Sequence, residues 1–68
     1  MKEIDARGLA CPEPVVLVQK GIQSNPDGVV VTVNAMVSVE NIKRFAAARG
    51  YTVTVCEQSG DYVLTLQK

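Results

Sequence analysis

A cysteine followed by two prolines is the feature of this sequence best suited to chemistry. Cys11 lies directly before Pro12, Glu13 and Pro14, where a strand is predicted to end and a helix to begin. Proline disfavours the α region for the residue before it, and it is favoured at the first helical position. We therefore expect Cys11 to be the N-cap residue, with Pro12, Glu13 and Pro14 as the first three residues of the helix.

The predicted position of Cys11 favours a reactive thiol. The positive end of a helix dipole stabilises the ionised form of a thiol beside it. Two prolines limit the effect, because they remove two of the N–H groups with which a helix start usually holds an anion. Glu13 also adds a negative charge nearby. We expect an exposed, moderately activated thiol, and the absence of histidine excludes a Cys–His pair within the chain.

The second cysteine, Cys56, is expected to have no chemical role. Thioredoxin-like sites use Cys-x-x-Cys, and here Pro14 occupies the place of the second cysteine. An intramolecular dithiol cycle would therefore require Cys56 to approach Cys11. Cys56 falls on the side of an alternating segment opposite Val53 and Val55, which predicts the less buried face of a strand. The two cysteines match no zinc or disulfide spacing, and we expect neither a metal nor a cofactor.

Apolar periodicity predicts the element order β-α-β-α-β-β. Strands are expected at residues 2–6, 29–33, 51–57 and 62–67, and a first helix at 12–24. A second helix is expected between Ser38 as N-cap and Gly50 just after its end. Two helices can cover one face of a sheet, which gives a two-layer α/β (α+β) sandwich. The predicted buried helix positions are Val15, Val18, Ile22, Val39, Ile42, Phe45 and Ala46.

This order predicts where a site would form. The first two strands should be parallel, so that their carboxyl ends lie at the same edge of the sheet. Cys11 and the loop Asn34–Val37 should then be neighbours. Met36 and Val37 are expected to stay partly exposed beside the thiol, as an apolar docking surface.

Length and charge exclude several classes of protein. The chain of 68 residues is long enough for one small domain, which we assign to residues 1–68. Lys and Arg number 7, and so do Asp and Glu, so the net charge is zero and favours neither nucleic acid nor an anionic membrane. No apolar run reaches the length of a membrane span, and the start lacks the apolar region of a signal peptide. A reducing cytoplasm is the expected location.

The segment 5–14, Asp-Ala-Arg-Gly-Leu-Ala-Cys-Pro-Glu-Pro, resembles the signature of the TusA/SirA/YedF family of small sulfur-carrier proteins. The resemblance extends over nearly the whole chain, and residues 39–46 with Gly50-Tyr51 resemble the YedF-type branch, which is associated with selenium metabolism. The resemblance implies a fold like the carboxy-terminal domain of translation initiation factor three, with sheet order 1-2-4-3. YedF-type proteins often continue into a second domain, so the chain is either a single-domain member or part of a longer protein.

The resemblance implies a role for each residue of the motif. Cys11 would accept a persulfide sulfur from a donor such as a cysteine desulfurase and relay it to a sulfur-accepting protein, for thiolation, cofactor or selenium metabolism. Arg7, Gly8, Pro12, Glu13 and Pro14 would shape the turn and the helix start. Partner docking is expected at Asn34, Met36 and Val37. Family members often carry acidic residues after the second strand, where this sequence has Asn34 and Ala35.

Two readings from other classes stay open. In the first, the chain is a non-catalytic interaction or regulatory module, and Cys11 is a structural N-cap. In the second, which depends on fold analogy alone, it binds RNA. Zero net charge and three aromatic residues argue against the RNA reading. Replacement of Cys11 by serine separates the first reading from a sulfur carrier, because a structural cap would tolerate it.

Overall fold

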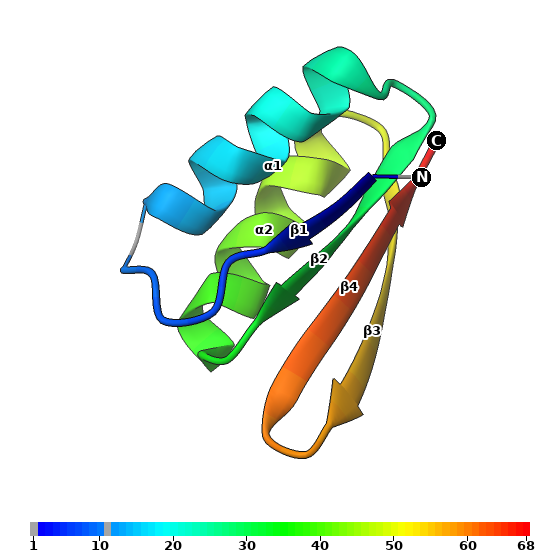
Figure 1. Ribbon diagram of the computed structural model, residues 1–68. Coiled ribbons are helices and arrows are strands. Elements are labelled where there is room, and N and C mark those ends of the chain that lie inside the picture. The colour runs from blue at the N-terminus through cyan, green and yellow to red at the C-terminus, as the bar shows by residue number, and fades with distance from the viewer. Residues whose placement is uncertain (1, 11) are drawn as a thin grey trace.

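The computed structural model describes residues 2–10 and 12–68, and it packs two helices against one face of a four-stranded sheet (Figure 1). The predicted order β-α-β-α-β-β and the two-layer architecture are confirmed. Neither helix is long and apolar enough to cross a membrane, as far as the described residues go. The elements in chain order are β1 Lys2–Asp5, α1 Glu13–Ser24, β2 Gly28–Val33, α2 Met36–Ala48, β3 Thr52–Gln58 and β4 Asp61–Gln67.

The sheet has the order β1-β2-β4-β3 that the family resemblance implied. β1 pairs with β2 in parallel, and β4 is antiparallel to both of its neighbours, β2 and β3. A hairpin joins β3 to β4, with Ser59 and Gly60 between the paired residues Gln58 and Asp61. In Figure 1 the ends of β1 and β2 and the tip of this hairpin therefore lie toward the same end of the sheet.

The core lies between the helices and the inner face of the sheet. Alternate residues of β2 and β4 point toward the helices. The side chains on this inner face are mostly buried, and those on the outer face are partly exposed. The predicted helix stripe is confirmed at Val18, Ile22, Val39, Ile42 and Ala46, whereas Val15 and Phe45 are only partly buried against it. The buried side chains of the sheet and its flanks are those of Ala6, Val29, Val31, Val33, Tyr51, Leu64 and Leu66.

Both helices begin at residues other than those predicted. The N-cap of α1 is Pro12, so the helical residues start at Glu13 and Pro14 is the second of them. The prediction of Pro12 at the first helical position is therefore wrong by one residue, and the predicted cap, Cys11, lies outside the described residues. Pro12 has φ −100° and ψ 15°, which lie outside the helical region, as expected for a cap residue.

The prediction of Ser38 as the N-cap of α2 is also wrong. The helix begins two residues earlier, at Met36, after an extended Ala35 with φ −129° and ψ 134°. Ser38 is only 3% exposed, and its N–H donates to the Ala35 carbonyl at 3.1 Å. A serine cap contributes about 1 kcal/mol, which is less than full burial of a single valine or isoleucine side chain contributes. Packing of Val39 against the sheet therefore sets the start of the helix.

Gly28 opens β2 in a conformation that other residues rarely adopt. Its φ is +146°, and it pairs with Gln67 at the start of the β2–β4 ladder. A Cβ atom at this position would collide with the carbonyl oxygen of Leu66 in β4. Position 28 thus requires glycine for two reasons, its positive φ and the close approach of the neighbouring strand.

We predict that Gly28→Ala lowers the free energy of unfolding by roughly 3 kcal/mol, because backbone strain and a steric clash add. Gly50→Ala is the matched control. Gly50 also has a positive φ, of +80°, but open space surrounds the position of its Cβ. It should cost only about 1 kcal/mol. Denaturant unfolding of both variants measures the difference, and equal losses would show that the contact with Leu66 does not matter.

Candidate functional site

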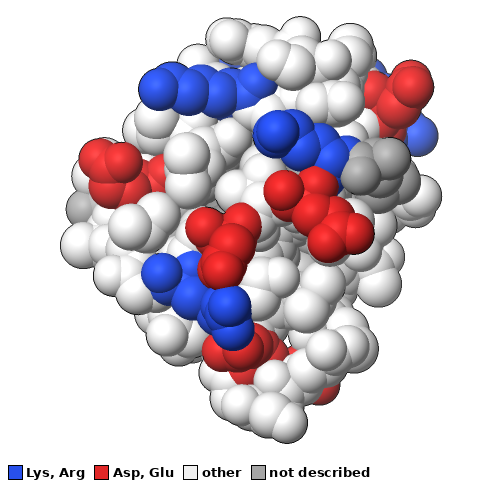
Figure 2. Space-filling model, viewed as in Figure 1, with Lys and Arg blue, Asp and Glu red and all other residues white. Residues whose placement is uncertain are grey.

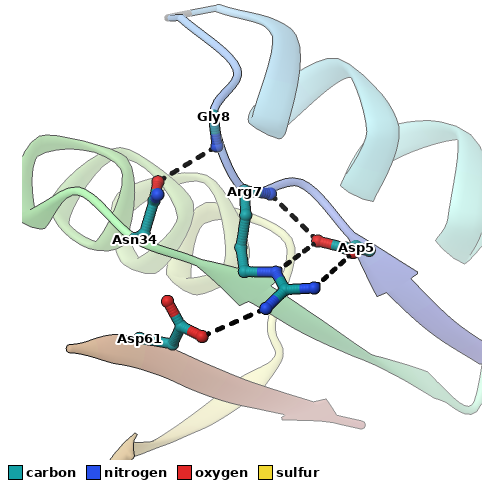
Figure 3. A network of polar contacts seen from close by, with 5 residues as sticks. All are labelled: Asp5, Arg7, Gly8, Asn34 and Asp61. Atoms are coloured by element: carbon teal, nitrogen blue, oxygen red, sulfur yellow. Dashed lines mark hydrogen bonds and ion pairs between the residues drawn. The ribbon is translucent and has the colours of Figure 1, made fainter. Parts of the chain in front are cut away.

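The loops that follow β1 and β2 are hydrogen-bonded to each other at the end of the sheet where these two strands finish. Ala6 N–H donates to the Thr32 carbonyl at 2.8 Å and continues the β1–β2 pairing. Two residues later, Gly8 N–H donates to the side-chain oxygen of Asn34 at 3.1 Å (Figure 3). Gly8 has φ +77°, which turns the chain out of the strand direction toward α1. The two loops therefore meet at Gly8 and Asn34, whereas the predicted proximity of Cys11 to residues 34–37 stays a prediction because Cys11 lies outside the described residues.

Arg7 joins this loop to the hairpin. Its Nε and Nη2 donate to the two carboxylate oxygens of Asp5, each at 2.9 Å, and its Nη1 reaches Asp61 at 3.2 Å. The backbone N–H of Arg7 also donates to Asp5, at 3.1 Å. Figure 3 shows the guanidinium between the end of β1 and the start of β4. One planar side chain thus links two segments that are 54 residues apart in sequence.

This network changes the titration of its members. Hydrogen bonds from the Arg7 side chain, and then from its backbone, lower the pKa of Asp5 from 3.8 to about 2. The same contacts raise the pKa of Arg7 above its ordinary value. The side chains of Arg7 and Asp5 are at least half exposed, so solvent screens the ion pair and its contribution to stability is small. Its effect is to hold the loop in one orientation rather than to stabilise the fold.

The start of α1 offers few free backbone donors. Pro12 and Pro14 have no N–H, and the N–H of Glu13 already donates to the Ala10 carbonyl at 2.9 Å. The one backbone N–H that residues 12–14 retain is therefore engaged within the loop. Direct hydrogen bonding by residues 12–14 therefore contributes little to holding a negative charge at this helix start.

Three large apolar side chains are exposed in the segments that follow β1 and β2. Leu9 in the first loop is 40% exposed, and Met36 and Val37 in the first turn of α2 are 52% and 60% exposed. The exposure predicted for Met36 and Val37 is thus confirmed, although they belong to a helix rather than to a connecting loop. An open hollow lies at this end of the sheet, and it is lined by Asp5, Arg7, Gly8, Leu9, Asn34 and Asp61. We call Leu9, Met36 and Val37 the apolar rim.

The candidate residues differ in how much the structure shows of them. Cys11 lies outside the described residues, so its predicted exposure stays a prediction. Cys56 is exposed on β3, and the Nε2 atom of Gln58 lies 3.9 Å from its sulfur. Asp61 was missed as a site residue, because only the sheet order places the start of β4 beside Arg7. Among the described residues, no group of three or more potential ligands could hold a metal ion.

The charges around the site are mixed. On the face shown in Figure 2, basic and acidic side chains alternate, and neither sign covers a large area. The chain as a whole carries no net charge. This face therefore lacks the basic stripe by which proteins attract nucleic acids.

Comparison with known proteins gives a consistent result. Residues 2–68 match the family model described as "Sulfurtransferase TusA". A Methanocaldococcus jannaschii protein named "Putative sulfur carrier protein MJ0990" is 38% identical over 61 residues, which cover 87% of this chain and 81% of that protein. The crystal structure of a SirA-like protein from Desulfitobacterium hafniense superposes with a TM-score of 0.90 at 31% identity, covering 98% of this chain and 96% of that one.

We predict that the pKa of Asp5 depends on Arg7. In the native protein Asp5 should titrate near 2, and in Arg7→Gln its pKa should return toward 3.8. Because the folded pKa is depressed, the interaction is complete above about pH 4 and is lost as the pH falls through about 2. Carboxyl chemical shifts measured by NMR across this range test the prediction. Lys43→Gln removes a cation elsewhere and is the control; an unchanged Asp5 pKa in Arg7→Gln would contradict the assignment.

Proposed function

The chain belongs to the TusA sulfurtransferase family, and on that premise we propose that Cys11 carries sulfur as a persulfide between two partner proteins. A sulfur-carrier function follows from the family. The identity of Cys11 as the carrying residue is supported by the Cys-Pro-Glu-Pro motif at residues 11–14 and by its place between β1 and α1. The observation that carries the proposal is that the loop leading to Cys11 is tied to β2 and β4 through Asn34 and Arg7.

The chemistry requires only an accessible thiolate. The Cys11 thiolate attacks the terminal sulfur of a persulfide on a donor protein, such as a cysteine desulfurase. A new sulfur–sulfur bond forms to Cys11 as the old one breaks, and the donor cysteine leaves as a thiolate. A nucleophile of the acceptor protein then takes the terminal sulfur and releases the Cys11 thiolate. Sulfur is transferred without net oxidation, and neither step needs a histidine base, which this chain lacks.

Asn34 is suited to a site that works through a thiolate. Its amide oxygen accepts the hydrogen bond from Gly8 N–H, as the carboxylate of an acidic residue would. An amide carries no negative charge, so Asn34 adds no charge that would oppose ionisation of the Cys11 thiol. Asparagine in place of the acidic residue common in the family therefore retains the hydrogen bond to the loop but carries no charge.

The apolar rim is proposed as the docking surface for both partners. Leu9, Met36 and Val37 are large apolar side chains that the fold leaves in solvent. Two of them occupy the first turn of α2, which begins two residues after Asn34, and the third lies in the loop to which Asn34 is hydrogen-bonded. A partner that buries them would exclude water from the transfer step, and apolar contact without charge suits successive partners. We place this exchange in the cytoplasm, where thiols stay reduced.

A structural role for Cys11 finds less support. The alternative of a non-catalytic module required Cys11 to be the N-cap of α1. That position belongs to Pro12, and no side-chain hydrogen bond caps the helix there. The position of Pro12 as N-cap supports the carrier proposal over this alternative, and the contacts of Cys11 itself lie outside the described residues.

Sulfur loading tests the proposed function directly. Incubation with a cysteine desulfurase and cysteine should add one sulfur atom per chain, detected by mass spectrometry of the intact protein. The adduct should be absent from Cys11→Ser and unchanged in Cys56→Ser, because only the first cysteine lies in the motif. Loading of Cys11→Ser to the level of the native protein would overturn the proposal.

The same assay separates docking from chemistry. Val37→Ser should slow loading several-fold while the final amount of adduct stays the same, since it alters the rim and leaves the motif intact. Val55→Ser, which changes an exposed valine on β3, is the matched control and should load at the native rate. Equal rates for the two variants would show that the rim takes no part in docking.

A further inference from the structure

The two edges of the sheet differ in how they are protected. β1 forms one edge with only four residues, and Lys2, Glu3 and Asp5 are charged. β3 forms the other edge with seven residues, of which only Glu57 is charged. Proteins usually protect exposed edge strands by shortness, by charged side chains or by proline. β1 has the first two of these devices, and β3 has none of the three apart from its single glutamate.

The outer side of β3 is also open. No element of the described chain lies beyond it, as Figure 1 shows. All its residues except Val53 are exposed, and Val55 at its centre is a large apolar side chain with 39% exposure. A fully paired ladder joins the inner side of β3 to β4 along its whole length. The strand is therefore held in an extended conformation by its partner while its outer backbone groups remain available.

We propose that β3 pairs antiparallel with β3 of a second copy of this chain, with the two-fold axis at Val55. In this register Val55 lies opposite Val55, and Thr54 of each copy lies opposite Cys56 of the other. The outer positions pair Val53 with Glu57 and Thr52 with Gln58. Cross-strand neighbours share a face, so the two sheets become one continuous sheet with all the helices on the same side.

Charge supports a second copy as the occupant of this edge. Each chain carries no net charge, so two copies do not repel each other at long range. In the proposed register no like charges are opposite, because each Glu57 faces a valine. The two exposed Val55 side chains are brought together on the axis. The pairing is self-complementary, as a two-fold interface requires.

The inference does not depend on the proposed function. β3 and β1 are at opposite edges of the sheet, with β2 and β4 between them. The apolar rim lies on α2 and on the loop after β1, so pairing through β3 leaves it uncovered. Both copies of a dimer could therefore bind partners independently.

Sedimentation equilibrium over a range of protein concentrations tests the pairing. The native protein should show a reversible monomer–dimer equilibrium. Val55→Lys should weaken it at least about tenfold, because two lysines would meet on the axis. Val37→Lys, at an exposed valine away from β3, should leave it unchanged. A native protein that stays monomeric throughout, or equal effects of the two variants, would overturn the proposal.

Disulfide trapping tests the register. In a Cys11→Ser background, Thr54→Cys should form a dimer on mild oxidation, because residues 54 and 56 of different copies are opposite. The same variant with Cys56→Ser should not, since two copies of residue 54 do not face each other. Dimers that form equally with and without Cys56 would rule out an axis at Val55.

Discussion

The parallel pairing of β1 with β2 is the constraint from which the rest of the site follows. Neighbouring parallel strands finish at the same end of the sheet, so the loops that follow β1 and β2 are adjacent. The first loop carries the cysteine motif and the second carries Asn34 and the start of α2. A single hydrogen bond between Gly8 and Asn34 then fixes their separation. β4 is antiparallel to β2, so it begins at this end of the sheet and places Asp61 beside Arg7.

The site is stiffened by local geometry rather than by burial. Arg7 is half exposed, and its ion pairs with Asp5 and Asp61 are weak in solvent. Proline at residues 12 and 14 restricts the backbone, and the Pro14 side chain is also fully buried. Such an arrangement suits a carrier, which must present one side chain to two different proteins in turn. It ties residues 5–8 to β4 and to Asn34, and it leaves the apolar rim exposed.

The element order and the core could be predicted because they depend on periodicity. β2 is an almost unbroken run of valines, and the helix stripes repeat at the expected spacing. The helix starts could not be predicted, because cap preferences are small beside the packing of residues such as Val39. The contacts of Arg7 with Asp61, and of the Tyr51 hydroxyl with the Pro26 carbonyl at 2.7 Å, join distant segments. Such contacts depend on the sheet order, which came from the family resemblance rather than from local patterns.

The central claim is that Cys11 is an accessible thiol with a populated thiolate. Its alkylation rate by iodoacetamide as a function of pH, measured in folded Cys56→Ser protein, tests this most directly. We expect a pKa modestly below the ~8.5 of a free cysteine, and a rate at high pH close to that of the unfolded chain. A thiol that reacts only after the protein is unfolded would contradict the account.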